Sequence, residues 1–350
     1  MAIRILYLTN KSKETIMSLP SNVSYYVKRF YENPNWDIKL LNPNRSKNIW
    51  SLAIAIWKIS PQILYIDNLQ GLNLLIVLKQ LRLLKCKIVV WKYTQCVYYD
   101  SSIIGRIKNY ILKRIYWKGF NRIYMAYDKH TEHAINNKII APQQISTLSR
   151  GVDEKWYQQF RTDLFIKPKF TVIATGKDNR DYYTLCKACE ETLTPCLILT
   201  RRHPANIKVA TLFTNSAWVK IIFIEDLNLK NEYKYIMKEV SKASILAIPC
   251  EKVPYGVGYT NEIEALPFYI PILVTHNEYA HLRVEKEGIG YEIPLHDTAG
   301  WKEKIQYLKL HPEVISTMSN NIKRLINREY NDNATTQFIE SDFIQLCTTK

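Results

Sequence analysis

The sequence predicts an α/β protein made of two doubly wound parallel-sheet domains. At 350 residues and 47% hydrophobic residues, the chain is long enough for two domains with separate cores. Short apolar runs alternate with segments of helical length, which is the pattern of parallel strands joined by helical crossovers. One stretch, Ala247–Thr275, adds the order strand, glycine loop, helix start and strand. That order is typical of a phosphate-binding turn in such sheets.

The first half of the chain contains enough strand and helix signals for one complete sheet domain. We expect strands at Ile3–Leu8, Trp36–Leu41, Ile63–Ile66, Lys87–Trp91 and Arg122–Ala126, and helices at Ser21–Tyr31, Leu72–Leu84, Ser101–Phe120 and Asp128–Asn136. Ligands of such sheets bind at the carboxyl ends of the strands. We therefore expect Asn10, Asp67 and the segment 91–94, with Lys92 and Tyr93, to line a cleft.

The segment 103–120 combines apolar and basic side chains. Five isoleucines (Ile103, Ile104, Ile107, Ile111 and Ile115) fall on one helical face, and five bases surround them: Arg106, Lys108, Lys113, Arg114 and Lys118. This pattern allows two interpretations. The helix contacts an anionic membrane surface, or it packs on the sheet with a solvated basic side.

The second half repeats the alternation. We expect strands at Phe170–Thr175, Pro195–Thr200, Val219–Ile224, Ser244–Pro249 and Ile270–Val274, and helices at Tyr183–Glu191, Glu232–Ala243, Asn261–Leu266, Ala299–Leu308 and Pro312–Tyr330. A last segment, Thr335–Leu346, is expected to pack back across the first domain.

The glycine loop 256–260 predicts a site for a phosphate. A glycine turn before a helix leaves backbone N–H groups free at the positive helix end. Thr260 is placed to cap the helix. Glu264 follows one turn later, where its carboxylate is suited to a ribose diol.

The run Gly258-x-Thr260-x-x-x-Glu264-Ala265-Leu266 resembles the donor-site segment of GT-B glycosyltransferases, family 4 type. Other segments match that family in the same order, among them Ile145–Asp153 and Gly176–Tyr182. The resemblance implies two Rossmann-like domains facing a cleft. Residues 1–150 would form the acceptor domain, 151–330 the nucleotide-sugar donor domain, and 331–350 a segment returning to the first domain.

By this resemblance the protein moves a sugar, with retention, from a nucleotide-diphosphate sugar to a polysaccharide or lipid-linked oligosaccharide. Arg180, then Lys177, would stabilise the departing diphosphate, Thr260 would contact it and Glu264 would hold the ribose. Gly176, Asn179, Gly258 and Tyr259 complete the expected donor site. Asn10, Lys92, Tyr93, Arg150 and Glu251 are weaker candidates for the acceptor side or the cleft. Arg150 stands where the family has Asn, and could reach a phosphate or form a surface ion pair.

The sequence departs from the family pattern at several positions. The first strand is not followed by glycines, no histidine follows Lys87–Trp91, and Gly256 stands where the family has a second acidic residue. Glu251 is the nearest substitute. These departures keep open a non-catalytic scaffold of the same fold as an alternative, and a sugar epimerase of that fold as another.

The net charge of +16 predicts an anionic partner, such as a nucleotide diphosphate, an acidic lipid headgroup or a nucleic acid. No nucleic-acid recognition motif accompanies the charge, so a basic nucleic-acid-binding protein remains only an alternative. The seven scattered cysteines indicate reduced thiols in a cytoplasmic protein. No metal or further cofactor is expected, because no D-x-D pattern is present and Cys186-x-x-Cys189 lacks a second ligand pair. We expect no membrane-spanning segment, and association at most with the inner face of the membrane.

Overall fold

The computed structural model describes residues 2–45, 48–67, 73–93, 96, 102–111, 116–161, 167, 169–253 and 255–348. The chain divides into two compact units. Unit 1 comprises residues 1–151 and 332–350, and unit 2 comprises residues 152–331. Each unit holds a six-stranded parallel sheet with helices, so the predicted α/β class with two doubly wound sheets is confirmed.

The sheet of unit 1 has the order β2-β1-β3-β4-β5-β6. Its strands are β1 (Ile3–Leu8), β2 (Trp36–Leu41), β3 (Ile63–Ile66), β4 (Lys87–Lys92), β5 (Arg122–Met125) and β6 (Ile145–Thr147). The chain moves from β1 to one side for β2 and then to the other side for β3. The strand order therefore reverses between β1 and β3, which is where ligands of such sheets bind.

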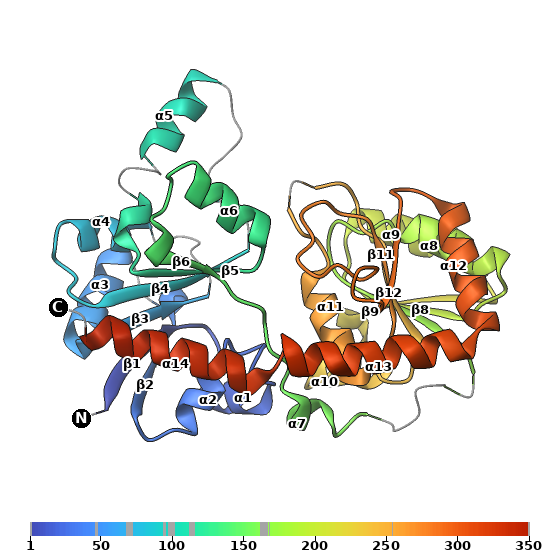
Figure 1. The fold of residues 1–350 in the computed structure, drawn as a ribbon, viewed down its shortest axis with the longest axis horizontal. Coiled ribbons are helices and arrows are strands. Elements are labelled where there is room, and N and C mark those ends of the chain that lie inside the picture. Colours follow the sequence, from blue (N-terminus) through green and yellow to red (C-terminus); the bar gives the residue numbers. More distant parts are fainter. Residues whose placement is uncertain are drawn as a thin grey trace. The chain divides into compact units, whose positions relative to one another are not determined.

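Helices cover both faces of this sheet (Figure 1). One face carries α3 (Ile49–Ile59), α4 (Asn73–Gln80), the 3₁₀ turn η3 (Trp117–Gly119) and α6 (Asp128–Asn136). The other face carries α1 (Lys13–Ser18), α2 (Val27–Tyr31) and the C-terminal helix α14 (Asp332–Thr348). Helix α5 (Ile103–Ile111) and the 3₁₀ turns η1 (Pro43–Arg45) and η4 (Pro142–Gln144) complete the unit.

Several predicted helices of unit 1 differ from those observed. Of the expected helix Ser21–Tyr31, only α2 forms, because Tyr25 and Tyr26 have positive φ angles of 51° and 65°. The expected helix Leu72–Leu84 ends at Gln80, and Arg82 then turns the chain at φ 58°. Of the expected helix Ser101–Phe120, the described residues form α5 (Ile103–Ile111) and a 3₁₀ turn at residues 117–119. Leu72 and residues 94, 101 and 112–115 lie outside the described part of the chain.

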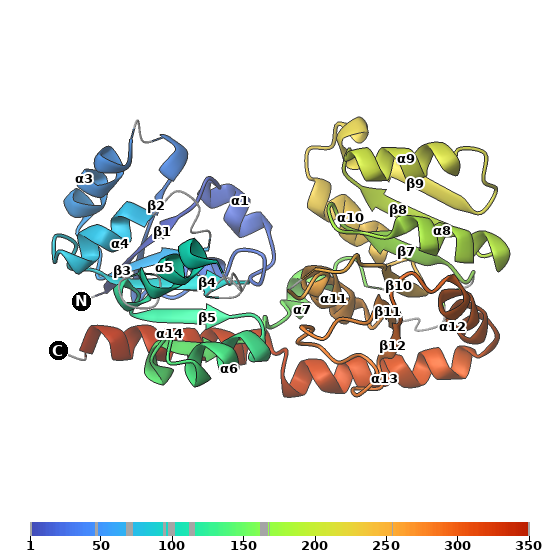
Figure 2. The same ribbon diagram turned by 90° about the horizontal axis from the view of Figure 1, so that it is seen from above.

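The sheet of unit 2 has the order β12-β11-β10-β7-β8-β9 (Figure 2). Its strands are β7 (Val172–Thr175), β8 (Cys196–Thr200), β9 (Val219–Phe223), β10 (Ile245–Ile248), β11 (Ile272–Thr275) and β12 (Gly290–Ile293). Here the order reverses between β7 and β10, so the corresponding ligand position lies at the carboxyl ends of those two strands. Strand β12 was not expected from the sequence.

The helices of unit 2 are α7 (Glu154–Tyr157), α8 (Tyr182–Glu191), α9 (Pro204–Leu212), α10 (Glu232–Val240), α11 (Tyr259–Ala265), α12 (Thr298–Leu310) and α13 (Pro312–Arg328), with 3₁₀ turns η5 (Ile224–Leu227) and η6 (Leu266–Phe268). A core of apolar residues from α8, α12 and α13 packs against one face of the sheet, including Leu185, Trp301 and Ile315. None of the described helices in the chain is both long and apolar enough to cross a bilayer.

Candidate functional site

Two loops meet at the carboxyl ends of β7 and β10. Arg180 forms an isolated antiparallel bridge with Cys250. The N–H of Asp181 donates to the Pro249 carbonyl at 3.1 Å, and the N–H of Glu251 donates to the Asn179 carbonyl at 3.1 Å. Backbone hydrogen bonds therefore fix the loop after β7 against the loop after β10, at the position where the strand order reverses.

A chain of side-chain hydrogen bonds crosses this position. The Arg180 Nη2 donates to Asn261 Oδ1 at 2.7 Å, and Asn261 Nδ2 lies 3.3 Å from Glu264 Oε2. The same Asn261 amide donates to Thr175 Oγ1 at 2.7 Å. Asn261 and Glu264 are buried. The structure thus brings together Arg180 and Glu264, which are 84 positions apart in the sequence.

Gly176 makes room for the arginine. Its φ is +135°, and a Cβ at this position would lie 2.5 Å from Nε of Arg180. Its carbonyl accepts hydrogen bonds from Tyr182 Oη at 2.8 Å and Thr200 Oγ1 at 2.7 Å. The loop is therefore held by two hydroxyl groups while its other side stays open to the guanidinium.

Lys177 and Asn179, the other polar residues predicted in this loop, point elsewhere. The Lys177 side chain is 69% exposed and pairs with Asp178 at 3.6 Å. Asn179 adopts a positive φ of 55°, and its Nδ2 donates to Tyr255 Oη at 3.0 Å. Only Arg180 of this loop takes part in the network around Asn261.

Helix α11 begins two residues earlier than a Thr260 cap would require. Gly258 is the N-cap, with φ +96°, and no side chain caps the helix. The predicted capping role of Thr260 is therefore wrong: Thr260 is the second helical residue and is exposed. Tyr259 is buried and packs edge-on against the His281 ring at 6.0 Å, so in unit 2 its ring contributes to packing.

Asn261 and Glu262 are two residues of α11 that the sequence analysis missed. Glu262 is only 2% exposed. Burial, and next the carboxylate of Glu292, raise its pKa to about 8. The spacing Asn261-x-x-Glu264 was the available signal, because residues three apart share a helix face.

Glu251, predicted as a cleft residue, belongs to a cluster at three loop ends. His296 Nδ1 lies 2.8 Å from Asp181 Oδ2, and His296 Nε2 lies 3.6 Å from Glu251 Oε2. The hydrogen bond to Asp181 raises the pKa of His296. The three groups are near enough to one another to share a cation. The imidazole already engages both carboxylates, however, and Asp181 also caps α8 through Thr184 N. We therefore interpret the cluster as a link between loops.

A cavity of about 740 Å³ opens beside this cluster at the carboxyl ends of β10, β11 and β12. Its walls include Glu251, Lys252, His276, Glu285 and Glu292. Burial raises the pKa of the Cys250 thiol in its wall to about 11, which keeps this thiol protonated at neutral pH. Carboxylates and amides at such a position are suited to the hydroxyl groups of a sugar.

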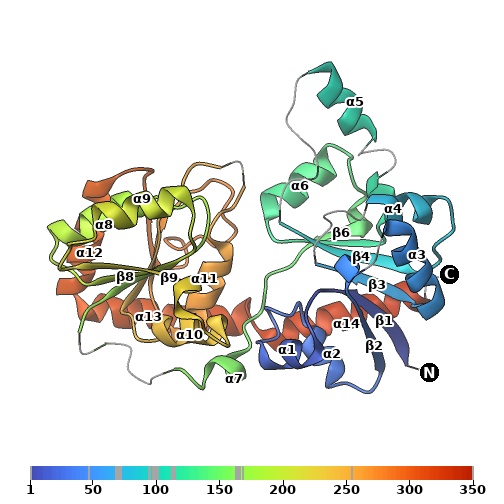
Figure 3. The same cartoon turned by 180° about the vertical axis from the view of Figure 1, so that it is seen from behind.

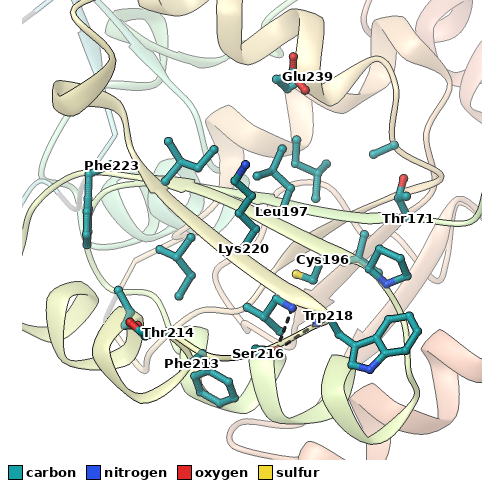
Figure 4. Close-up of a pocket in the computed structure, with 18 of the residues that line it drawn as sticks. Thr171, Cys196, Leu197, Phe213, Thr214, Ser216, Trp218, Lys220, Phe223 and Glu239 are labelled. Carbon is teal, nitrogen blue, oxygen red and sulfur yellow. Dashed lines mark hydrogen bonds between the residues drawn. The ribbon is translucent and has the colours of Figure 1, made fainter.

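A second hollow, of about 890 Å³, follows the edge strand β9 (Figure 4). It extends from Thr171, Cys196 and Trp218 at the amino ends of the strands to Phe223 at the carboxyl end of β9. None of the predicted site residues lines it. The candidate site is therefore the β7/β10 position and the cavity next to it.

Four of the predicted acceptor-side residues lie in unit 1, and two of them, Arg150 and Tyr93, lie against the ring of Tyr25. Arg150 is buried, its Nη2 donates to the Asn22 carbonyl at 2.6 Å, and its guanidinium lies 5.5 Å from the Tyr25 ring centre. Arg150 is therefore not the surface residue that the ion-pair alternative assumed. Asn10 is exposed in the loop after β1. The rings of Tyr93 and Tyr25 pack edge to face, with their centres 6.3 Å apart.

Lys92, unlike Arg150 and Tyr93, points toward the face of the sheet that carries η3. Its Nζ lies 5.6 Å from the Trp117 ring centre, and burial lowers its pKa. His130 of α6 lies beside it: burial, and next the charge of Lys92, lower the pKa of this imidazole. A histidine of α6 thus lies within electrostatic reach of Lys92, the last residue of β4.

Asp67 stands at the β1/β3 position of unit 1. It accepts a hydrogen bond from Tyr7 Oη at 2.5 Å, and burial raises its pKa. Lys11, from the loop after β1, is close enough to act on it electrostatically. The carboxyl end of this sheet therefore carries a charged pair at the position where its strand order reverses.

No protein-family model matches the sequence, and no curated protein matches it. Solved structures do match over nearly the whole chain. A glycosyltransferase from Rickettsia africae ESF-5 superposes with a TM-score of 0.73 at 13% identity, covering 100% of both chains. Sucrose-phosphate synthase from Thermosynechococcus elongatus matches with a TM-score of 0.69 at 13% identity, covering 98% of this chain and 99% of that one.

The Anabaena protein HepE, solved in complex with UDP, matches with a TM-score of 0.67 at 10% identity, covering 99% of this chain and 100% of that one. These neighbours are glycosyltransferases of the GT-B type. At such low identity the likeness establishes the fold: the chain has the GT-B fold.

Proposed function

Because the chain has the GT-B fold, we propose that it is a glycosyltransferase that uses a nucleotide-diphosphate sugar. The observation that carries this proposal is the contact Arg180–Asn261–Glu264 at the β7/β10 position. It joins a fixed cation, suited to a diphosphate, to a carboxylate, suited to a ribose diol. HepE, a structural neighbour, was solved with UDP and with UDP-glucose, which supports the same class of donor.

The chemistry follows from what the leaving group requires. As the bond between the sugar C1 and the phosphate oxygen breaks, its electron pair passes to the diphosphate, and Arg180 stabilises the added charge. In a retaining reaction of family 4 type the acceptor oxygen attacks C1 on the face that the diphosphate leaves. The acceptor proton passes to a departing phosphate oxygen. In this scheme the protein supplies position and electrostatics, and no covalent nucleophile is required.

We assign the donor to unit 2 and the acceptor, a polysaccharide or lipid-linked oligosaccharide, to unit 1. In unit 2, Gly176 and Asn179 belong to the loop that carries Arg180, Gly258 and Thr260 lie at the start of α11, and Lys177 adds an exposed cation to the first of these segments. In unit 1, Asn10 and Tyr93 stand near the carboxyl ends of β1 and β4. The cavity beside Glu251 provides space for the sugar of the donor.

The proposed place of action is the inner face of a membrane, contacted through the segment 103–120. Helix α5 supports this: Ile103, Ile104 and Ile107 are exposed, as are Arg106 and Lys108. The alternative prediction, a helix packed on the sheet by its isoleucines, does not fit these exposed side chains.

Two substitutions test the donor site. Arg180→Ala is expected to lower turnover about 30- to 1000-fold, which corresponds to the 2–4 kcal/mol that one such contact contributes in the transition state. Glu264→Gln is expected chiefly to weaken nucleotide binding. A thermal-shift panel of UDP-, GDP-, ADP- and CMP-linked sugars identifies the donor, and release of the nucleotide gives the rates.

Arg328→Ala is the matched control, because Arg328 is an exposed arginine of unit 2 on α13. The proposal fails if both site variants keep full activity. A folded protein that neither binds nor hydrolyses any of these donors would favour the scaffold alternative. Tight, strongly salt-dependent binding of RNA or DNA by the same protein would favour a nucleic-acid function instead.

A further inference from the structure

Helix α3 carries apolar residues on two sides. Leu52, Ala53 and Ile56 are buried in the core of unit 1. Trp50, Ile54 and Trp57 are 57%, 53% and 72% exposed. Their spacing of four and three residues puts these three side chains on one face, which we call the α3 stripe. The outer face of a helix in water normally carries polar residues, so a stripe of two tryptophans and an isoleucine indicates a binding surface.

Neighbouring elements extend the apolar surface. Helix α4 packs beside α3 (Figure 3), where Val77 is exposed on the helix and Leu81 and Leu83 are exposed in the turn after it. Helices α3, α4 and α5 all lie on the side of the sheet opposite α14 (Figure 1). The exposed apolar residues therefore belong to one side of unit 1.

The charge of the same region has one sign. Residues 38–127 contain fifteen Lys and Arg and only two acidic residues, Asp67 and Asp100. The sequences of α3, α4 and α5 contain neither Asp nor Glu. Bases exposed on or next to these helices are Lys58, Arg82, Lys85, Arg106 and Lys108.

We propose that the α3 stripe inserts into the headgroup region of an anionic lipid bilayer. Tryptophan is the side chain best suited to that layer, because its ring is apolar and its N–H is polar. Lys and Arg near the surface add electrostatic attraction to anionic lipid. A bilayer matches both features, a broad apolar stripe and positive charge spread over several helices.

This surface is a second lipid contact, separate from α5, and its existence does not depend on the glycosyl-transfer proposal. Lipid binding and sugar transfer can therefore succeed or fail independently of each other. Because the stripe side chains are more than half exposed, replacing them leaves the buried side of α3 intact.

The test is co-sedimentation of the full chain with vesicles of phosphatidylcholine and phosphatidylglycerol, compared with vesicles of phosphatidylcholine alone. The wild type is expected to bind the anionic vesicles and to lose most of that binding at 1 M salt, where the Debye length is about 3 Å. The double variant Trp50→Gln/Trp57→Gln is expected to bind at least about tenfold more weakly, because burial of two indole rings is lost. Ile103→Gln/Ile107→Gln measures the α5 contact separately.

Leu212→Gln/Leu310→Gln is the matched control, because both leucines are exposed residues of unit 2. Circular dichroism verifies that each variant is folded. The proposal is overturned if the Trp50/Trp57 variant binds anionic vesicles as well as the wild type does, or if the wild type binds none. It is also overturned if light scattering shows that the stripe holds two copies of the chain together in the presence of vesicles.

Discussion

Asn261 is the residue on which the candidate donor site depends at the smallest scale. Its amide accepts from Arg180 and lies within hydrogen-bond reach of both Thr175 and Glu264, so one side chain orients a cation and a carboxylate together. The sequence analysis identified Arg180 and Glu264 and passed over the residue between them. The reason is that an asparagine in a short helix has no distinctive pattern, and its role appears only when its partners are brought together.

We predict that Asn261→Ala lowers kcat more than it raises KM for the donor. Arg180 keeps its charge but loses the hydrogen bond that aims it, and a lost hydrogen bond to a charged group costs about 1.5–3 kcal/mol, roughly 10- to 150-fold in rate. Steady-state kinetics of nucleotide release measure the changes in kcat and in KM separately. Asn321→Ala is the matched control, since Asn321 donates to the Gly288 carbonyl at 2.9 Å elsewhere in unit 2. Equal losses in the two variants would contradict a positioning role.

The raised pKa of Glu262 predicts how the free energy of unfolding depends on pH. Burial is the chief cause that raises its pKa from the ordinary value of 4.5 to about 8 in the folded protein. Between pH 4.5 and 8 the Glu262 carboxyl is protonated in the folded state and ionised in the unfolded chain. The contribution of Glu262 to the free energy of unfolding is therefore greatest below pH 4.5 and falls as the pH rises toward 8. The slope is at most about 1.4 kcal/mol per pH unit. Urea denaturation at several pH values measures it. Glu262→Gln is expected to remove most of the dependence, whereas exposed Glu303→Gln is expected to leave it unchanged.

At the scale of elements, buried strands were predicted best. The bounds of β1, β2 and β3 match the expected ranges residue for residue. Strands β1 and β3 are short, largely apolar runs, whereas the edge strand β2 begins with alternating apolar and polar residues, and both patterns are typical of strands. Helices were less well predicted. Helix α3 was missed because it is apolar on both sides and shows no amphipathic period, and the expected helix at 21–31 was shortened by two tyrosines at positive φ.

The loop after β7 gives a prediction at this scale. Gly176→Ala is expected to displace Arg180, because the new Cβ would lie 2.5–2.9 Å from three atoms of the guanidinium and the φ of +135° disfavours any residue with a Cβ. We expect weaker diphosphate binding together with a loss of about 1–3 kcal/mol in stability. Calorimetric titration with the donor nucleotide measures the binding. If the alanine variant binds as the wild type does, Arg180 does not hold the diphosphate in the observed position.

At the scale of the whole molecule, the C-terminal helix belongs to the first sheet. Phe343 of α14 contacts the rings of Phe30, Trp36 and Tyr65 in the core of unit 1. Asp342 receives hydrogen bonds from Arg122 and from Tyr124 Oη at 2.6 Å. Asp332, at the start of α14, accepts hydrogen bonds from the Ser21 hydroxyl and from the Arg29 guanidinium. Unit 1 is therefore completed by the last residues of the chain.

We predict that Asp342→Asn destabilises unit 1 by about 3–5 kcal/mol, because it removes one partner of a buried ion pair and leaves the Arg122 charge uncompensated. Chemical denaturation of the full chain, followed through the tryptophans of unit 1, measures the effect. The exposed acidic residue Glu329, changed to Gln, serves as the control. A loss below about 1 kcal/mol, the usual value of a surface pair, would show that α14 is not held by this contact.

By itself the sequence determined the fold class, most strands and the two segments that hold Arg180 and Glu264. These are local properties, because a buried strand requires a run of apolar residues and a turn with a positive φ favours glycine. The tertiary structure decided which side chains meet. Asn261 joins the two segments, Arg150 is buried, Lys92 lies beside His130, and Trp50, Ile54 and Trp57 stay exposed. Such contacts depend on crossovers and loop geometry that join residues far apart in the chain, and no local pattern encodes them.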